Sequence, residues 1–204
     1  PRSPIPAPMA SRALIMLALA STARAFVAPA ARAGVRGFRS SSVSMIAEGD
    51  KLPMDATLMV LADGKPTDVS LTDVFAGKKV VMFAVPGAFT KTCDAAHAPP
   101  YVAKADEFKA KGVDSVICVT VNDPFVVSRW AETLDPEGKV DWYSDGGAAF
   151  VKALDLSFET GNFGGTRFKR LSMIVDDGVV SKLNVEDGGA FTEVSAAETA
   201  LGQL

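Results

Sequence analysis

The chain has 204 residues, of which 48 % are hydrophobic, enough for one globular domain and an N-terminal extension. Its two cysteines, with no Cys-x-x-Cys pair, and its single histidine exclude a disulfide framework and the common zinc sites. Six arginines and no acidic residue precede Glu48, whereas the remainder carries 15 Lys and Arg against 24 acidic residues. A domain this acidic is a poor candidate for binding nucleic acid.

The basic N-terminal section has the pattern of two targeting signals in series. Residues 13–20 form an apolar stretch, too short to span a membrane, and an Ala-x-Ala cleavage pattern follows at residues 23–25. The next stretch opens with Phe26 and is rich in Ala, Arg and Ser, which is similar to the bipartite presequence of algae with secondary plastids. We expect residues 1–44 to be a targeting presequence for the plastid stroma, with mitochondrial import or secretion as alternatives.

Residues 45–204 are expected to form the folded domain, because strands and helices alternate along them. In chain order the patterns predict a strand at 57–61, a turn at 62–66, a short strand and helical turn at 69–75, and a strand at 79–85. A helix is expected after Cys93, which Pro99 and Pro100 interrupt before it continues over 101–111; a strand at 113–121 and a helix at 125–134 capped by Asp123 follow. The remaining patterns predict a strand at 141–144, a helix at 148–154, a hairpin of strands 170–175 and 179–185, and a last helix opened by a capping box from Ser195 to Glu198. This order predicts an α/β fold with a mixed central sheet flanked by helices.

One cysteine lies where such a fold concentrates its chemistry. Cys93 comes shortly after the apolar strand 79–85, and Asn122 follows the strand 113–121, so both lie at the carboxyl ends where α/β sheets bind ligands. The first turn of a helix leaves N–H groups unpaired and favours an anion, here the nucleophilic thiolate. A helix terminus contributes at most about 2 kcal/mol, so fast chemistry also requires donors that polarise the substrate.

The run from Val85 to Cys93 reads Val-Pro-Gly-Ala-Phe-Thr-Lys-Thr-Cys and contains the Pro-x-x-x-Thr-x-x-Cys pattern of the peroxiredoxins. With His97 and Pro99 after it, the wider run resembles the type II peroxiredoxins, the group that includes the peroxiredoxin-5-like and plant type II enzymes of the redoxin superfamily. The resemblance extends over residues 45–204. It implies a thioredoxin-like fold.

The resemblance also assigns roles to individual residues. Cys93 would be the peroxidatic nucleophile, which attacks a hydroperoxide and becomes a sulfenic acid. Thr90 would hydrogen-bond the sulfur and the incoming oxygen, or cap the helix, and Pro86 would shape the pocket. The family's active-site arginine corresponds to Arg170, in the run Lys-Arg-Leu-Ser-Met from residue 169. Two other arginines, at positions 129 and 167, are expected to be solvated surface charges.

His97 lies four residues after Cys93, on the same face of the predicted helix. A Cys–His pair also occurs in cysteine hydrolases, but no third orienting group or oxyanion loop is visible in the sequence. By resemblance to the family, we expect His97 to be a structural residue near the site.

Cys118 leaves two alternatives open. It lies in the middle of an apolar strand, which is typical of a buried, inert thiol, yet it follows Cys93 by 25 residues, as the second cysteine does in plant type II enzymes. Either Cys118 resolves the oxidised Cys93 after local unfolding, or an external thiol does. We favour the external thiol: glutathione with glutaredoxin, or thioredoxin.

The resemblance therefore implies a thiol-dependent peroxidase that reduces hydrogen peroxide and alkyl hydroperoxides in antioxidant defence and needs no cofactor. The resemblance also implies a homodimer; the other expected partners are the hydroperoxide and a thiol reductant, without nucleic acid or membrane. A peroxide-sensing redox signalling protein with low turnover is the alternative function.

Overall fold

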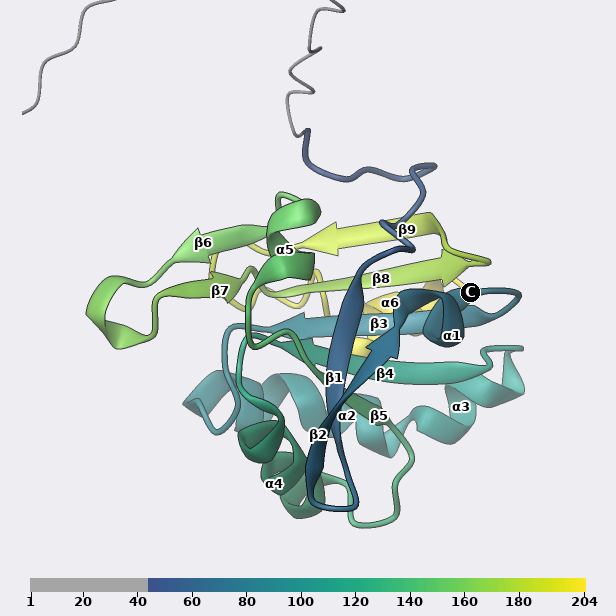
Figure 1. Ribbon diagram of the computed structural model, residues 1–204. Helices are drawn as coiled ribbons and strands as arrows, with labels where there is room; N and C mark the ends of the chain where they lie inside the picture. The colour runs from purple at the N-terminus through teal and green to yellow at the C-terminus, as the bar shows by residue number, and fades with distance from the viewer. Residues whose placement is uncertain (1–43) are drawn as a thin grey trace, which may run out of the picture. The chain divides into compact units, whose positions relative to one another are not determined.

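The computed structural model describes residues 44–204, so the predicted presequence lies outside the described part except for Ser44. A seven-stranded sheet with the strand order β2-β1-β5-β4-β3-β8-β9 forms the centre of the domain (Figure 1). Its strands are β1 (Thr57–Ala62), β2 (Lys65–Ser70), β3 (Lys79–Val85), β4 (Ser115–Thr120), β5 (Asp141–Ser144), β8 (Leu171–Asp176) and β9 (Val179–Val185).

The sheet is mixed, as predicted. β3, β4 and β5 run parallel to one another, while β8 pairs antiparallel with β3 and β9 with β8. β3 lies between β4 and β8, and its last six residues are buried, as its uninterrupted apolar sequence requires. The carboxyl ends of the three parallel strands therefore meet at one edge of the domain, which is where the chain carries its candidate chemistry.

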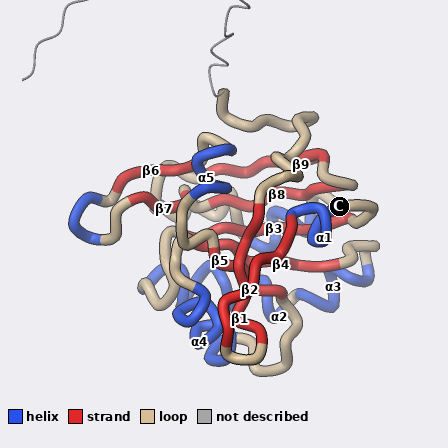
Figure 2. The backbone as a smooth tube through the Cα atoms, in the orientation of Figure 1, coloured by secondary structure: helices blue, strands red, loops and turns tan. Residues whose placement is uncertain are grey.

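Helices cover both faces of the sheet (Figure 2). On one face lie α1 (Leu71–Phe75) and α5 (Ala149–Ala153); on the other lie α2 (Ala98–Ala103), α3 (Ala105–Ala110), α4 (Pro124–Leu134) and α6 (Ala197–Gly202). Successive side chains of β3 point to opposite faces, so Met82 joins the first core cluster and Phe83 the second. Both cysteines belong to the second cluster.

A small second sheet was not predicted from the sequence. β6 (Ser157–Glu159) and β7 (Thr166–Phe168) pair antiparallel around the short 3₁₀ turn Gly161–Phe163. Figure 1 shows this hairpin projecting away from the seven-stranded sheet. Its strands have three residues each, too short for a periodic hydrophobic pattern to reveal them.

Two local predictions were wrong. Helix α6 begins at Ala197 without a side-chain cap, because the Ser195 hydroxyl bonds to Glu186 and His97 instead. The prolines do not end their helix, which runs from Lys91 through the π turn Cys93–His97 into α2; Pro99 and Pro100 lie near the start of α2, and the break comes later, at Lys104 between α2 and α3. The irregular turn comes before them.

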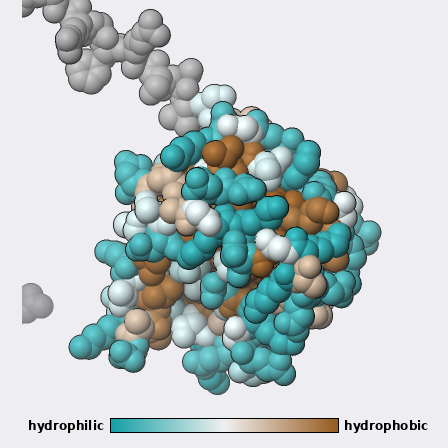
Figure 3. Space-filling view, turned by 90° about the vertical axis from the view of Figure 1, so that its right-hand side faces the viewer, coloured by the Kyte–Doolittle hydropathy of each residue, from teal (hydrophilic) through white to brown (hydrophobic). Residues whose placement is uncertain are grey.

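Figure 3 shows that hydrophilic side chains cover much of one face of the domain, with apolar groups interspersed. Within residues 44–204, no helix is long and apolar enough to cross a membrane.

Candidate active site

Cys93 opens an irregular helical turn at the edge where the parallel strands end. The helix starts at Lys91, and residues Cys93–His97 form a π turn in which the Ala98 N–H bonds to the Cys93 carbonyl. Single π turns inside helices occur frequently at functional sites. Cys93 is completely buried and its thiol is free, so a reactive sulfur would be held away from bulk water.

Arg170 provides a cation at the sulfur. Its Nη2 lies 3.4 Å from Cys93 Sγ, although the two residues are 77 positions apart. The guanidinium is held by the carbonyls of Gly189 and Ala190 and lies over the ring of Phe191. Arg170 is 2 % exposed, and none of the ion pairs among residues 44–204 includes it. Within the described range this buried charge thus has no carboxylate partner, and a thiolate beside it would be stabilised.

His97 orients Arg170 rather than Cys93. Its Nδ1 lies 3.1 Å from Arg170 Nη1 and its Nε2 lies 2.9 Å from the Ser195 carbonyl oxygen. Because an arginine only donates, Nδ1 accepts and the ring proton sits on Nε2. Burial, followed by the nearby charge of Arg170, lowers the pKa of His97 to about 4. The imidazole is therefore neutral at physiological pH.

Two polar residues that the sequence analysis did not assign to the site extend this chain of contacts. Glu186 is buried and accepts four hydrogen bonds, from the backbone N–H and the hydroxyl of both Thr192 and Ser195. Ser195 in turn contacts His97 through its carbonyl and hydroxyl oxygens. The order Glu186, Ser195, His97, Arg170, Cys93 thus forms one continuous buried network. No local pattern reveals it, since its members come from four separate segments.

Thr90 and Pro86 frame the loop before Cys93. The Thr90 hydroxyl donates to the Gly87 carbonyl at 2.9 Å, and the hydrogen bonds of residues 44–204 include none from it to Cys93 Sγ or to a helix N–H. The half-buried ring of Pro86 follows β3. Asn122, at the end of β4, fixes the same loop because its Oδ1 accepts the Ala88 N–H at 3.0 Å. The structure therefore brings Thr90, Pro86 and Asn122 to the edge where Cys93 lies.

Cys118 is in the middle of β4, with Phe83 and Trp142 as its neighbours on the two adjoining strands. It is fully buried, and burial raises its pKa well above the ordinary value of a thiol. The second-largest influence is the charge of Cys93, which acts in the same direction. Cys118 is thus a neutral thiol on a strand that pairs with β3 on one side and with β5 on the other.

The two other arginines differ from each other. Arg129 is exposed and pairs with Glu132 on α4, as expected of a surface charge. Arg167 was expected to be solvated too, but it is half-buried and donates to the carbonyls of Val121 and Gly164. These bonds join the β6–β7 hairpin to the end of β4.

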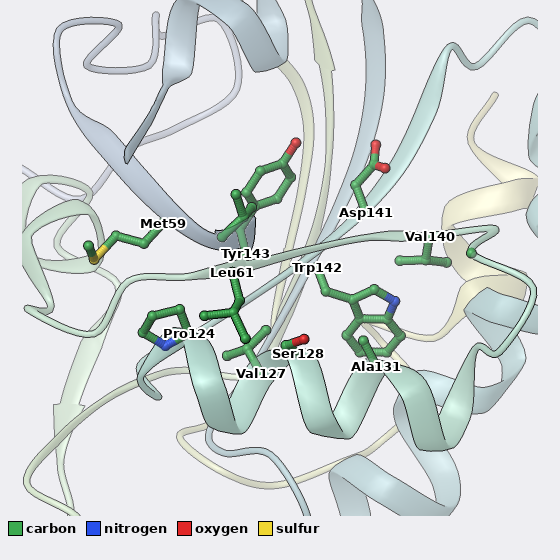
Figure 4. A pocket seen from close by; sticks show the side chains of 12 residues that line it. Met59, Leu61, Pro124, Val127, Ser128, Ala131, Val140, Asp141, Trp142 and Tyr143 are labelled. Carbon is green, nitrogen blue, oxygen red and sulfur yellow. The ribbon is translucent and has the colours of Figure 1, made fainter. Parts of the chain in front are cut away.

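Two hollows of the described part of the domain are not lined by Cys93. A groove of about 300 Å³ lies between α4, β1 and β5, where the side chains of Leu61, Val127 and Trp142 line it (Figure 4). A second hollow, of about 290 Å³, includes His97 and Phe191. Among the residues that the structure describes, no group of three or more His, Cys, Asp or Glu side chains could hold a metal ion.

Comparison with known proteins agrees with the motif and the geometry. The redoxin family model matches residues 47–201. The chain is 47 % identical over 165 residues to "Peroxiredoxin-2E-2, chloroplastic" of Oryza sativa subsp. japonica, covering 78 % of this chain and 73 % of that protein. It is 40 % identical over 178 residues to "Peroxiredoxin-2F, mitochondrial" of Arabidopsis thaliana, covering 82 % of this chain and 89 % of the relative.

Solved structures show the same fold. The reduced Prx3 of Vibrio vulnificus in complex with H₂O₂ superposes with a TM-score of 0.74 at 50 % identity, covering 78 % of this chain and 99 % of that one. Peroxiredoxin 5 from Alvinella pompejana superposes with a TM-score of 0.66 at 30 % identity, covering 78 % and 99 %. The thioredoxin-like fold is thereby confirmed, and the chain belongs to the redoxin family, within it to the type II peroxiredoxins.

Proposed function

We propose that this protein is a thiol-dependent peroxidase in which Cys93 reduces hydrogen peroxide and alkyl hydroperoxides. The observation that supports it best is the Arg170 guanidinium, which lies against Cys93 Sγ without a carboxylate partner among residues 44–204. Such a cation stabilises the attacking thiolate and the negative charge that develops on the oxygens of the peroxide. The names of the relatives agree with this activity.

The reaction needs only the sulfur, the peroxide and these donors. The Cys93 thiolate attacks the terminal oxygen of R–O–OH, the S–O bond forms and the O–O bond breaks. The leaving alkoxide takes a proton from solvent and departs as the alcohol, while Cys93 becomes a sulfenic acid. Arg170 holds the charged oxygens, and the neutral His97 orients Arg170. Thr90 offers its oxygen to the incoming hydroperoxide, and Pro86 limits the access of water to the loop. A metal or prosthetic group has no part in these steps.

The ring nitrogens of His97 argue against a cysteine hydrolase. Nδ1 accepts from Arg170 and Nε2 bonds to Ser195, so neither nitrogen is in place to take a proton from Cys93. A general base must lie within hydrogen-bond reach of the proton that it abstracts. His97 therefore acts as an orienting residue.

An external thiol completes the cycle. Cys118 is held by hydrogen-bonded neighbours on both sides, and a disulfide demands a Cα separation of about 4.4–6.8 Å with suitable geometry. Reaching it would require β4 to unfold locally, whereas an external thiol needs only the loop before Cys93 to open. We assign the reducing role to glutathione with glutaredoxin, or to thioredoxin.

The names of the relatives and the exposed surface support a proposal for the setting. Two of the relatives are named chloroplastic and the N-terminal section has the composition of a presequence, so we place the enzyme in the plastid, in antioxidant defence and redox homeostasis. Phe89 and Phe125 expose large apolar side chains, 52 % and 55 % accessible, near the edge that carries Cys93. We propose that this edge forms a homodimer.

The decisive experiment is the intact mass of the reduced full chain after one equivalent of hydrogen peroxide. One added oxygen that is absent in Cys93→Ser supports the nucleophile and an external reductant. Loss of two hydrogens, with a Cys93–Cys118 peptide after digestion, makes Cys118 the resolving residue. An unchanged mass on the seconds timescale overturns the peroxidase function. Slow oxidation with a lasting partner adduct would instead favour a redox sensor.

A further inference from the structure

A polar pocket adjoins the active-site loop and has no role in the reaction with peroxide. It measures about 470 Å³ and lies beyond the carboxyl ends of β4 and β5, within the size range of small-ligand sites. Its lining includes Asn122, Asp123, Gly147, Lys152 and Arg167. The pocket is open to solvent, whereas Cys93 is buried.

The charges in this pocket have spare bonding capacity. Arg167 is fixed through Nε and Nη1 by the Gly164 and Val121 carbonyls, and the hydrogen bonds among residues 44–204 leave its Nη2 unused. Lys152 takes part in none of the ion pairs of this range. Asp123 accepts the Phe125 and Val126 N–H groups with one oxygen only, Oδ1. The lining of this one hollow therefore includes two cationic residues and one carboxylate.

Two residues that line the pocket, Asn122 and Arg167, lie next to the active-site loop. A Cβ atom placed on Gly87 would lie 3.2 Å from Thr90 Cγ2 and 3.9 Å from Arg167 Nη1. Asn122, which lines the pocket, also holds the Ala88 N–H. A ligand bound by Arg167 and Asn122 would thus lie beside the loop that precedes the buried Cys93.

We propose that this pocket binds the charged end of a peptide thiol with the chemistry of glutathione, which carries two carboxylates and one ammonium group. Lys152 and Arg167 would bind the carboxylates, and the free oxygen of Asp123 would accept from the ammonium. A guanidinium fixed by the protein is well suited to a carboxylate. This inference rests on the proposed function, since it concerns the thiol that reduces oxidised Cys93.

The chemistry balances with this thiol alone. The bound thiol attacks the Cys93 sulfenic acid, an S–S bond forms, the S–O bond breaks, and water leaves with the thiol proton. A second thiol attacks the mixed disulfide and releases Cys93 as a thiol, and the two thiols leave as their disulfide. The pocket would raise the local concentration of the first thiol beside the loop.

The experiment separates the two half-reactions in the full chain. Each protein is oxidised with one equivalent of hydrogen peroxide, mixed with glutathione or with uncharged 2-mercaptoethanol, quenched and weighed by mass spectrometry. Lys152→Glu should lower the rate constant with glutathione about tenfold, which corresponds to about 1.4 kcal/mol, while 2-mercaptoethanol keeps its rate. Lys65→Glu, a matched charge reversal on β2, should change neither rate. High salt should reduce the difference between the glutathione rate constants of Lys152→Glu and the wild type.

Two outcomes would overturn the inference. If Lys152→Glu lowers the rates of reduction by glutathione and by 2-mercaptoethanol equally, or changes neither rate, the pocket has no part in thiol recognition, although Cys93 is still oxidised. If the wild-type mass does not change with peroxide, the proposed function itself fails and this inference falls with it. The oxidation step thus distinguishes the two failures.

Discussion

Arg170 Nη1 lies 3.1 Å from His97 Nδ1, and this contact fixes Nδ1 as the acceptor nitrogen of the imidazole. Arginine has no acceptor, so the bond exists only while Nδ1 carries no proton. His97 therefore acts as a neutral acceptor that holds a cation against Cys93. Protonation of His97 would place two positive charges side by side in a buried site.

The first prediction concerns acid stability. The pKa of His97 is lowered to about 4 from an ordinary value of 6.5, so between these values the unfolded chain binds a proton that the folded chain does not. The free energy of unfolding should thus rise with pH across this window, by about 3 kcal/mol in all, and this contribution should be lost as the pH falls from about 6.5 to about 4.

Urea unfolding of the reduced protein at several pH values measures this effect. His97→Gln keeps a neutral side chain at the position but cannot titrate, so its free energy of unfolding should vary less over the same window. An identical pH dependence in the wild type and His97→Gln would contradict the prediction.

The second prediction concerns the cation. Arg170 spans the Cys93 sulfur, His97 and two loop carbonyls at once, and a lysine cannot reproduce this fork. Arg170→Lys should slow the oxidation of Cys93 by peroxide by about 100-fold, the usual loss when one transition-state donor is removed. Stopped-flow kinetics under single-turnover conditions would measure it. Arg129→Lys, on the exposed face of α4, should keep the wild-type rate; a wild-type rate in Arg170→Lys would exclude the assigned role.

How far the sequence predicts this molecule depends on how local each feature is. The strands at 79–85 and 141–144 were predicted with the bounds that the structure has, and the cap at Asp123 was predicted from its side chain and the proline after it. Each of these features is encoded in a few adjacent residues. The peroxiredoxin motif is equally local, so the position of Cys93 followed from it.

The buried network behind Cys93 is not local. Glu186, Ser195 and Arg170 meet because β8 and β9 pair and the chain then folds back over the helix that carries His97. The same tertiary contact explains why the capping-box prediction failed: a serine that bonds to a buried carboxylate and an imidazole is no longer available as a cap. Long-range contacts of this kind leave no periodicity in the sequence.

The third prediction tests the far end of that network. Burial alone would raise the pKa of Glu186, but the hydrogen bonds from Thr192 and Ser195 outweigh burial and lower it. Glu186→Gln replaces an acceptor oxygen by an NH₂ group that faces donors, which should destabilise the fold by about 1–3 kcal/mol. It should also slow Cys93 oxidation, since Ser195 would no longer hold His97 firmly.

Urea unfolding and single-turnover kinetics give the two measurements. Glu193→Gln, a matched change on the exposed part of the same loop, should alter neither. A Glu186→Gln protein with lowered stability but an unchanged oxidation rate would limit Glu186 to a structural role.

The fourth prediction concerns the homodimer. Phe125 follows the Asp123 cap of α4 and is more than half exposed. A single exposed phenylalanine also occurs on monomers, but aromatic side chains are enriched at the cores of dimer interfaces. Phe125→Glu should shift the protein toward monomers in sedimentation velocity at micromolar concentration. Val179→Glu, at the opposite end of the sheet, should not. The prediction is refuted if the wild type is itself a monomer.

The fifth prediction concerns Cys118. If an external thiol reduces Cys93, then Cys118→Ala should keep steady-state peroxidase turnover with that thiol, because the second sulfur takes no part in the cycle. The variant removes a buried sulfur from the centre of β4 and should therefore lose stability, by about 1–2 kcal/mol on the scale of small cavity-forming substitutions. Turnover should be compared at temperatures well below the unfolding midpoint of both proteins, so that the lower stability does not mimic lost activity. A variant that is folded and oxidised once, yet cannot complete a second cycle, would show that Cys118 resolves Cys93 and that β4 opens during the reaction.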